Sequence, residues 1–179
     1  MSEIARDANF GEKREEQNMY GKILVPLDGS DLAAQILPQV EELAKAFKSE
    51  ITLITVGFLI TLYSTTAEFS YKSVEDLEAS LKKDAENRLE RYAAKLKAKG
   101  LKVSQVYVKG VPAHEIINYA DENKYDLIAM ATHGRGEVAW VLGSVAEKVV
   151  SHATVPVLLM RVLDLKQPVV KKADYIGPD

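Results

Sequence analysis

The sequence predicts an α/β protein built on a doubly wound, five-stranded parallel sheet. Short apolar runs typical of strands alternate with segments of helical periodicity, and the fourth run is almost wholly apolar, as a strand covered on both faces should be. Strands that are separated by helices cannot pair as hairpins, so we expect parallel pairing with right-handed crossovers. In such a sheet, ligands bind beyond the carboxyl ends of the strands, where the strand order reverses.

The expected strands and helices follow one another in strict alternation. Strands are predicted at residues 22–27, 51–57, 101–108, 126–131 and 155–161. Helices are predicted to begin at Ser30, Ser73, Pro112 and Ser144. Serine is a common N-cap, and proline fits a first helical turn. Pro38 falls inside the first helix, where we expect a kink, and residues 58–72 are expected to form a long loop.

The second helix carries one apolar stripe. Its members recur at helical spacing and are Val74, Leu77, Leu81, Ala85, Leu89, Tyr92 and Leu96. Gly100 is expected to end this helix. Lysine and glutamate fill much of the remaining sequence between residues 75 and 99, which is typical of a solvent-exposed face.

Length and composition restrict the possible functions. The 179 residues suit one domain, expected over residues 19–162, with a polar extension at residues 1–18 and a tail at residues 163–179. The net charge of −3 gives no overall attraction to nucleic acid or to a membrane surface, and no apolar run is long enough for a membrane span. Without cysteine there is no disulfide framework and no zinc–thiolate site. No export signal is recognisable, so we expect a cytoplasmic protein.

The most informative segment follows the fourth strand. It consists of Ala131-Thr132-His133-Gly134-Arg135-Gly136 and, further on, Gly143-Ser144. A strand end, a glycine loop and a helix start therefore come in succession. Ser144 and Glu147 fit a capping box, which would place Gly143 beside free helix amides that attract an anion. Glycine there leaves room for phosphate oxygens. The alternative is that Gly143 only turns the chain and Ser144 only caps the helix.

Other candidate features are weaker. Residues 134–139 match the relaxed dinucleotide fingerprint, but they do not follow the first strand and no acid ends the next one. Asp28 either starts a turn after the first strand or faces the same crevice as the glycine loop. Among the histidines, whose spacing fits no metal site, His133 lies in that loop, whereas His114 and His152 are expected on exposed helix surfaces.

Several segments together resemble the universal stress protein family. They are residues 22–30 (KILVPLDGS), 110–113 (GVPA), 126–135 (DLIAMATHGR), 142–149 (LGSVAEKV) and 155–159 (VPVLL). The resemblance extends from Met19 to Arg161. It implies the adenine nucleotide alpha hydrolase-like strand order 3-2-1-4-5, with helices on both faces. That order would put Asp28 and the Gly134 loop across the point where the strand order reverses.

The resemblance also implies a set of nucleotide-binding residues. In members that bind ATP, the turn after strand 1 and the end of strand 2 hold the adenosine, while glycines and a Ser or Thr hold the phosphates. The candidates in this chain are Pro26, Leu27, Asp28, Val56, Met130, Ala131, His133, Gly134, Arg135, Gly136, Gly143, Ser144 and Val145. The implied ligand is ATP or AMP, with or without Mg²⁺. The chain departs from the family pattern because Ala131 replaces a glycine and the loop between Gly134 and Gly143 is one residue shorter.

The resulting hypothesis is an adenine-nucleotide-binding regulatory protein of the stress response, without efficient catalysis. Hydrolysis needs a positioned water, a metal site and charge stabilisation, for which the sequence offers only Asp28, His133 and Arg135. One alternative is a nucleotide-free adaptor that acts through protein contacts. Another is an ATP-pyrophosphatase-like enzyme, but the SGGxDS motif of those enzymes is absent from residues 26–31.

The last strand, which begins at Val155 and ends at Arg161, would lie at the sheet edge. It is almost wholly apolar and carries no inward charge to discourage pairing. Two copies could pair these strands antiparallel across a two-fold axis, and many members of the family dimerise in this way. The alternative is that the tail covers the edge with Val169 and Val170.

Overall fold

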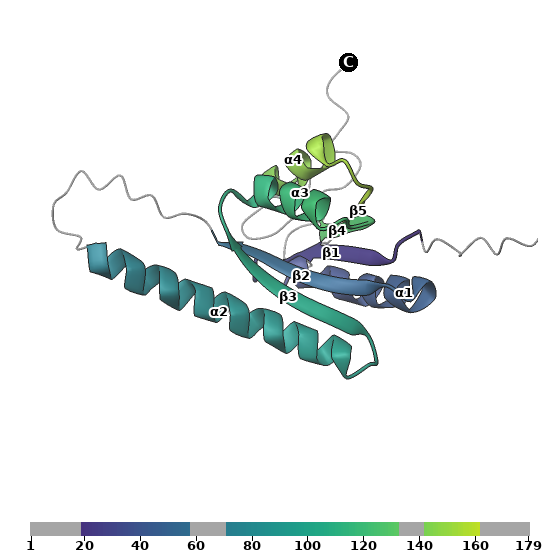
Figure 1. Cartoon of the computed structure of the whole chain (residues 1–179), viewed down its shortest axis with the longest axis horizontal. Helices are drawn as coiled ribbons and strands as arrows, with labels where there is room; N and C mark the ends of the chain where they lie inside the picture. Colours follow the sequence, from purple (N-terminus) through teal and green to yellow (C-terminus); the bar gives the residue numbers. More distant parts are fainter. Residues whose placement is uncertain (1–18, 58–70, 133–141, 162–179) are drawn as a thin grey trace, which may run out of the picture.

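A computed structural model of the chain describes residues 19–57, 71–132 and 142–161 (Figure 1). The strands are β1 (Lys22–Pro26), β2 (Glu50–Gly57), β3 (Lys102–Lys109), β4 (Leu127–Ala131) and β5 (Val157–Met160). The helices are α1 (Leu37–Phe47), α2 (Tyr71–Lys97), α3 (Pro112–Glu122) and α4 (Ser144–His152), and a short 3-10 helix, η1 (Ala33–Ile36), directly precedes α1. The alternation of strands and helices is the one predicted.

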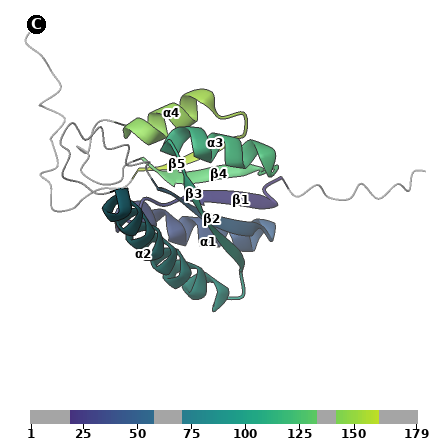
Figure 2. The same ribbon diagram turned by 60° about the vertical axis from the view of Figure 1, so that its left-hand side comes forward.

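All five strands pair in parallel in the order β3-β2-β1-β4-β5, which confirms the predicted fold class. Helices α1 and α2 cover one face of the sheet, and α3 and α4 cover the other (Figure 2). Successive residues of a strand point to opposite faces, so the fully buried Ile23 and Val25 pack toward α1 and α2, whereas Leu24 packs toward α3 and α4. The central strand thus contributes to both halves of the core.

The central strand separates from one neighbour before it ends. β1 pairs with β2 through Pro26 but with β4 only at Ile23 and Leu24. The amide of Leu27 donates to the Ile54 carbonyl of β2 at 2.8 Å. The backbone groups of successive strand residues point to opposite neighbouring strands, so those of position 26 face β4. Proline has no amide to donate there. The ladder between β1 and β4 therefore stops, and a crevice opens between the strand ends.

The start of α1 differs from the prediction. The helix was expected from Ser30 with a kink at Pro38, but α1 begins at Leu37 and has no proline in its interior. Pro38 lies in the first turn, where a helix needs no amide from it, so no kink arises. Ser30 still accepts a hydrogen bond from the Ala33 amide at 3.0 Å, one turn before η1 passes into α1.

Helix α2 begins at Tyr71, two residues before the predicted start, and the rest of the predicted loop lies outside the described residues. Gly100, with φ of +82°, follows the helix as expected. In the predicted stripe Ala85, Leu89 and Leu96 are buried, but Leu77 and Leu81 are 48% and 47% exposed.

The length of α2 explains this exposure. Its 27 residues span about 40 Å, whereas the eight residues of β3 span about 27 Å. The first turns of α2 therefore project past the sheet (Figure 1). Despite this length, neither α2 nor any other helix in the described ranges is apolar enough to cross a membrane.

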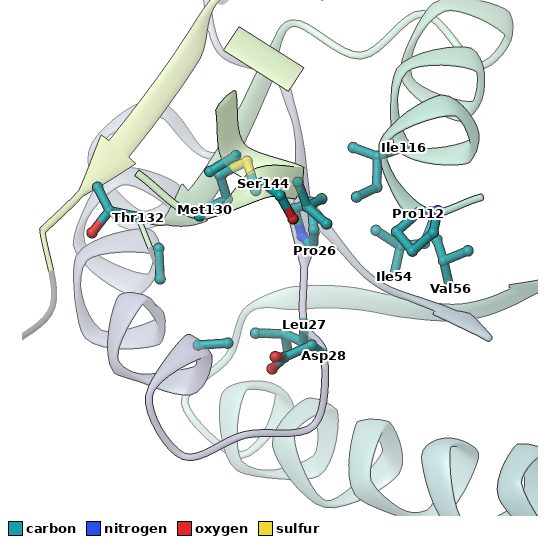
Figure 3. Close-up of a pocket in the computed structure, with 15 residues that line it drawn as sticks. Pro26, Leu27, Asp28, Ile54, Val56, Pro112, Ile116, Met130, Thr132 and Ser144 are labelled. Atoms are coloured by element: carbon teal, nitrogen blue, oxygen red, sulfur yellow. The ribbon is translucent and has the colours of Figure 1, made fainter. Parts of the chain in front are cut away.

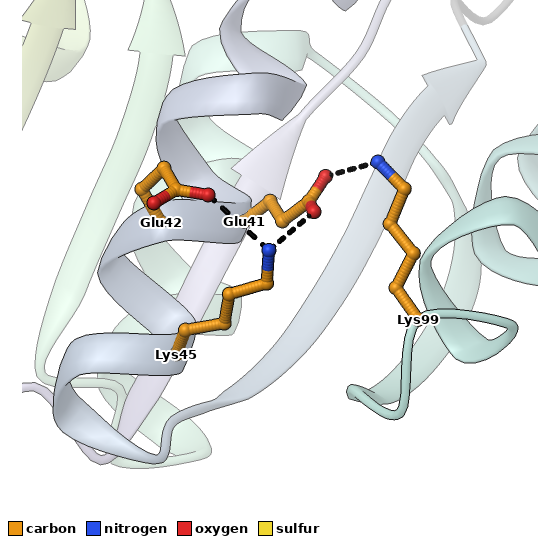
Figure 4. A network of polar contacts seen from close by, with 4 residues as sticks. All are labelled: Glu41, Glu42, Lys45 and Lys99. Atoms are coloured by element: carbon orange, nitrogen blue, oxygen red, sulfur yellow. Dashed lines mark hydrogen bonds and ion pairs between the residues drawn. The ribbon is translucent and has the colours of Figure 1, made fainter.

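A buried carboxylate links α1 to the end of α2. Glu41 is only 8% exposed, and its two oxygens contact the ammonium groups of Lys45 at 2.7 Å and Lys99 at 2.5 Å (Figure 4). Lys99 lies just after the end of α2, so this contact joins the two helices on the same face of the sheet. The hydrogen bonds from Lys45 and then Lys99 hold the pKa of Glu41 below its ordinary value, against the opposing effect of burial.

We expect Glu41→Gln to lower the free energy of unfolding more than Glu42→Gln, whose carboxylate contacts Lys45 from a side chain that is 76% exposed. A carboxyl with a lowered pKa stabilises the fold above its ordinary pKa of 4.5, and this contribution is lost as the pH falls through the lowered value. The difference between wild type and Glu41→Gln should therefore be full at neutral pH and shrink below pH 4.5. Urea unfolding followed by circular dichroism measures it, and a difference that is independent of pH would contradict the expectation.

Candidate functional site

A pocket of about 280 Å³ lies at the carboxyl ends of β1, β2 and β4, next to the first turn of α4 (Figure 3). It occupies the crevice that opens where β1 and β4 separate. Its walls come from strand ends that are adjacent in the sheet but distant in the sequence, and from the first turns of α3 and α4. The position is the one expected for a ligand in a doubly wound sheet.

The predicted site residues that the structure describes all line this pocket. They are Pro26, Leu27, Asp28, Val56, Met130, Ala131, Gly143, Ser144 and Val145. His133, Gly134, Arg135 and Gly136 lie outside the described residues. That these side chains and amides bind a nucleotide stays a prediction, but the fold brings the described ones to a single place.

The pocket also contains residues that sequence reasoning missed. They are Ala33, Ile54, Pro112, Ile116, Thr132 and Ala146. Ile54 was within reach of prediction, because it lies two residues before Val56 and therefore on the same face of β2. Ile116 could have been paired with Pro112, since residues four apart share a helix face. Ala33 carries no such signal.

One side of the pocket is an apolar wall. It consists of Ile54 and Val56 of β2 and Pro112 and Ile116 of α3, which pack close to one another (Figure 3). Pro26, which is buried, also lines the pocket. An apolar wall with few polar groups is typical of a site that holds a flat ring by contact area.

The opposite side of the pocket is polar because α4 begins there. Gly143 is the N-cap, and its amide donates to the Thr132 carbonyl at 3.0 Å, which fixes the helix start to the end of β4. The first three helical amides, from Ser144 to Ala146, have no acceptor among the described residues. They line the pocket together with the Ser144 hydroxyl, which points inward (Figure 3).

The predicted capping box at Ser144 is wrong. Ser144 is the first helical residue rather than the N-cap, so its hydroxyl is not placed to accept an amide of the first turn. The Glu147 amide donates instead to the Gly143 carbonyl at 2.8 Å. The hydroxyl and the three amides therefore remain available to a ligand in the pocket.

Asp28 both forms a turn after β1 and lines the pocket. Its Oδ1 accepts hydrogen bonds from the amide and hydroxyl of Ser30, at 2.9 and 2.6 Å, so it forms the expected turn. Its exposed side chain also lines the pocket. A further bond holds this turn in place, because Thr55 Oγ1 donates to the Leu27 carbonyl at 2.8 Å.

Metal-binding side chains do not gather in the described parts of the chain. Those parts contain no group of three His, Asp or Glu residues that could hold an ion. His114 is exposed beside Glu115 at 3.1 Å, and His152 contacts the Lys148 carbonyl at 2.9 Å, both outside the pocket. Among the described lining residues, Asp28 is the ionisable one.

Two low-identity neighbours share this fold. A universal stress protein in complex with cAMP has a TM-score of 0.55 at 21% identity, over 80% of this chain and 98% of that one. The universal stress protein of Archaeoglobus fulgidus in complex with dAMP has a TM-score of 0.54 at 19% identity, over 79% and 98% of the two chains. At this identity the likeness extends to the fold alone.

Two other proteins share a higher sequence identity with this chain over most of its length. Universal stress protein MJ0531 of Methanocaldococcus jannaschii is 34% identical over 149 residues, which cover 83% of this chain and 86% of that protein. The solved structure of MJ0577, a universal stress protein of the same organism, has a TM-score of 0.70 at 30% identity, over 82% of this chain and 99% of that one. The sequence model of the universal stress protein family matches residues 19–161, and the chain belongs to that family.

Proposed function

We propose that this protein binds an adenine nucleotide, ATP or AMP, in the pocket at the carboxyl ends of β1, β2 and β4, and that it acts as a regulatory protein of the stress response. One observation carries the proposal: an apolar wall and three helix amides without acceptors among the described residues share one pocket. A nucleotide has this same division, with an apolar ring at one end and an anion at the other.

The adenine base is assigned to the apolar side of the pocket. It would lie against the wall formed by Ile54, Val56, Pro112 and Ile116. The volume of about 280 Å³ lies near the lower end of the range of roughly 300–1,000 Å³ that small-molecule sites occupy. The cAMP and dAMP complexes of proteins with the same fold support an adenine ligand.

The phosphates are assigned to the start of α4. Free amides and the positive end of the helix dipole both favour an anion there. Gly143 has φ of −59° and ψ of 143°, a conformation open to any residue, so the backbone does not demand glycine. The absence of a side chain beside the amides is therefore best explained by the space that a phosphate needs.

Efficient catalysis is not part of the proposal. Phosphoryl transfer needs a positioned nucleophile, metal ions and charge stabilisation. In the described lining, Asp28 supplies one carboxylate, and one of its oxygens is already engaged by Ser30. That carboxylate and the Ser144 hydroxyl would suit Mg²⁺ held jointly with nucleotide phosphates, which is an accompanying ion rather than a hydrolytic centre.

Nucleotide binding should raise the melting temperature. A ligand at 100 times its dissociation constant adds about 2.7 kcal/mol to the stability of the folded state. For a chain of this size each kcal/mol corresponds to about 2–4 °C. Differential scanning fluorimetry with ATP and Mg²⁺, ADP and AMP should show a shift of several degrees with at least one of them. No shift at millimolar concentration with any of the three would favour a nucleotide-free adaptor.

Replacing Gly143 by valine should weaken nucleotide binding at least tenfold while the fold is retained. The branched side chain would occupy the space assigned to phosphate, and tenfold corresponds to about 1.4 kcal/mol. Loss of the glycine N-cap should cost about 1 kcal/mol of stability or less. Ser151→Val, at an exposed position of the same helix, is the matched control. Calorimetric titration measures both, and unchanged affinity in a folded Gly143→Val protein would remove phosphate from this helix.

We further propose that two chains assemble through β5. This strand pairs with β4 on one side and lies at the sheet edge, and Leu158 in its middle is 37% exposed. Unpaired amides and carbonyls along an apolar edge strand favour pairing with another strand. Antiparallel pairing with the same strand of a second copy would continue the sheet across a two-fold axis.

Light scattering at micromolar concentration should give the mass of two chains of 19.8 kDa each. Leu158→Lys should shift the mass to one chain, because a charge on an edge strand discourages pairing. Val150→Lys, at a 45% exposed position of α4, is the control and should remain dimeric. A chain that lacks residues 163–179 should also remain dimeric. Loss of the dimer on that deletion would move the interface from the strand to the tail.

A further inference from the structure

A second cavity lies on the other face of the sheet. It has a volume of about 490 Å³ and is lined by α2, from Glu75 to Arg88, and by the carboxyl ends of β2 and β3. Its walls include Tyr107 and Lys109 of β3 and Ala85 and Arg88 of α2. It meets the nucleotide pocket only at Asp28 and Val56. The proposed nucleotide site makes no use of it.

Arg88 gives this cavity an unused hydrogen-bond donor. Among the described residues, only two buried side-chain polar atoms have no hydrogen-bond partner, Arg88 Nε and Gln105 Oε1, and only Arg88 lines the cavity. No described carboxylate forms an ion pair with Arg88. The Nε atom is itself buried, so an acceptor from outside the chain would meet the other N–H groups of the Arg88 guanidinium, which lines the cavity.

Tyr107 is held beside this cavity by a specific contact. A Cβ added at Gly57 would lie 1.7 Å from the Tyr107 hydroxyl oxygen, so only glycine at the end of β2 admits the tyrosine in this position. Lys82 stands over the Tyr107 ring, with its ammonium 5.9 Å from the ring centre. The cavity therefore presents a guanidinium and a phenol, together with the Lys82 ammonium, which is paired with Glu86 at 3.7 Å.

The lining carries three carboxylates and three cationic groups, and Arg88 is the cation that no described carboxylate pairs. Glu78 is paired with Lys109 at 2.5 Å, and Oδ1 of Asp28 is engaged by Ser30. Glu75 is exposed at the rim, whereas the buried Thr55 and Ala85 mark the inner end.

We propose that this cavity binds a small organic anion, a carboxylate or a phosphate monoester that carries an apolar group. The anionic end would accept hydrogen bonds from the Arg88 guanidinium, whose planar set of N–H groups matches both anions. The apolar end would lie against Ala79, Leu81 and Ala85, which form the α2 wall of the cavity. The volume of about 490 Å³ is within the range of small-molecule sites.

The test uses NMR of the full-length, ¹⁵N-labelled protein with three probes: phenyl phosphate, hexanoate and inorganic phosphate. The Arg88 Nε–Hε signal should shift in a saturable manner with phenyl phosphate, with hexanoate or with both, and inorganic phosphate should bind at least tenfold more weakly. The signal belongs to Arg88 alone, so anion binding at the start of α4 does not affect the outcome. No saturable shift with any probe at millimolar concentration overturns the proposal. Inorganic phosphate that binds as tightly as phenyl phosphate overturns the organic class of the ligand.

Two variants provide the matched comparison. Arg88→Gln should weaken binding of the responding probe at least tenfold, whereas Arg91→Gln, at an exposed position of the same helix with the same change of charge, should bind as wild type does. Far-UV circular dichroism checks that both are folded, and calorimetric titration gives the affinities. Equal affinity of Arg88→Gln and wild type overturns the assignment of the anion to Arg88.

Discussion

The missing amide of Pro26 determines where the crevice between β1 and β4 opens. Position 26 is buried and faces β4, so any other residue would bring an amide that needs an acceptor there. With proline, the strands separate without leaving a buried donor unpaired. The separation of β1 from β4 then leaves no amide of position 26 unpaired, and the α4 amides and the β2 side chains line the crevice. A glycine at position 26 would still carry a backbone amide, which would need an acceptor there.

The hydrogen bond from Gly143 to Thr132 sets the other wall of the same crevice. It joins the first turn of α4 to the end of β4. This bears on the loop that is one residue shorter than the family pattern, because Gly143, Ser144 and Val145 line the pocket in spite of the shortening. The helix start is therefore placed by β4 itself.

The sequence was sufficient for the features that depend on local pattern and on strand order. Apolar runs located the strands, and residues at strand ends were expected to meet because parallel strands end at one edge of a sheet. Features that depend on competition between neighbours were not predictable in the same way. Pro38 was expected to kink a helix that begins at Ser30, but a proline also fits a first turn, and the structure places it there after η1. At Ser144 the choice of N-cap depends on the bond that Gly143 makes to β4.

The stripe on α2 predicts which face is apolar but not how far the sheet extends beneath it, so the exposure of Leu77 and the second cavity went unforeseen.

The end of β2 contributes to both cavities through the alternation of a strand. Ile54 and Val56 project toward α3, whereas Thr55 and Gly57 lie on the side of α2. The two cavities nevertheless offer an anion different kinds of donor. At α4 the donors are backbone amides, which any sequence that keeps this helix start will supply. At α2 they are the side chains of Arg88 and Tyr107, and the tyrosine also requires Gly57. Single substitutions can remove the second set but not the first. The pocket proposed for a nucleotide therefore follows from the fold, whereas the α2 cavity is a property of this particular sequence.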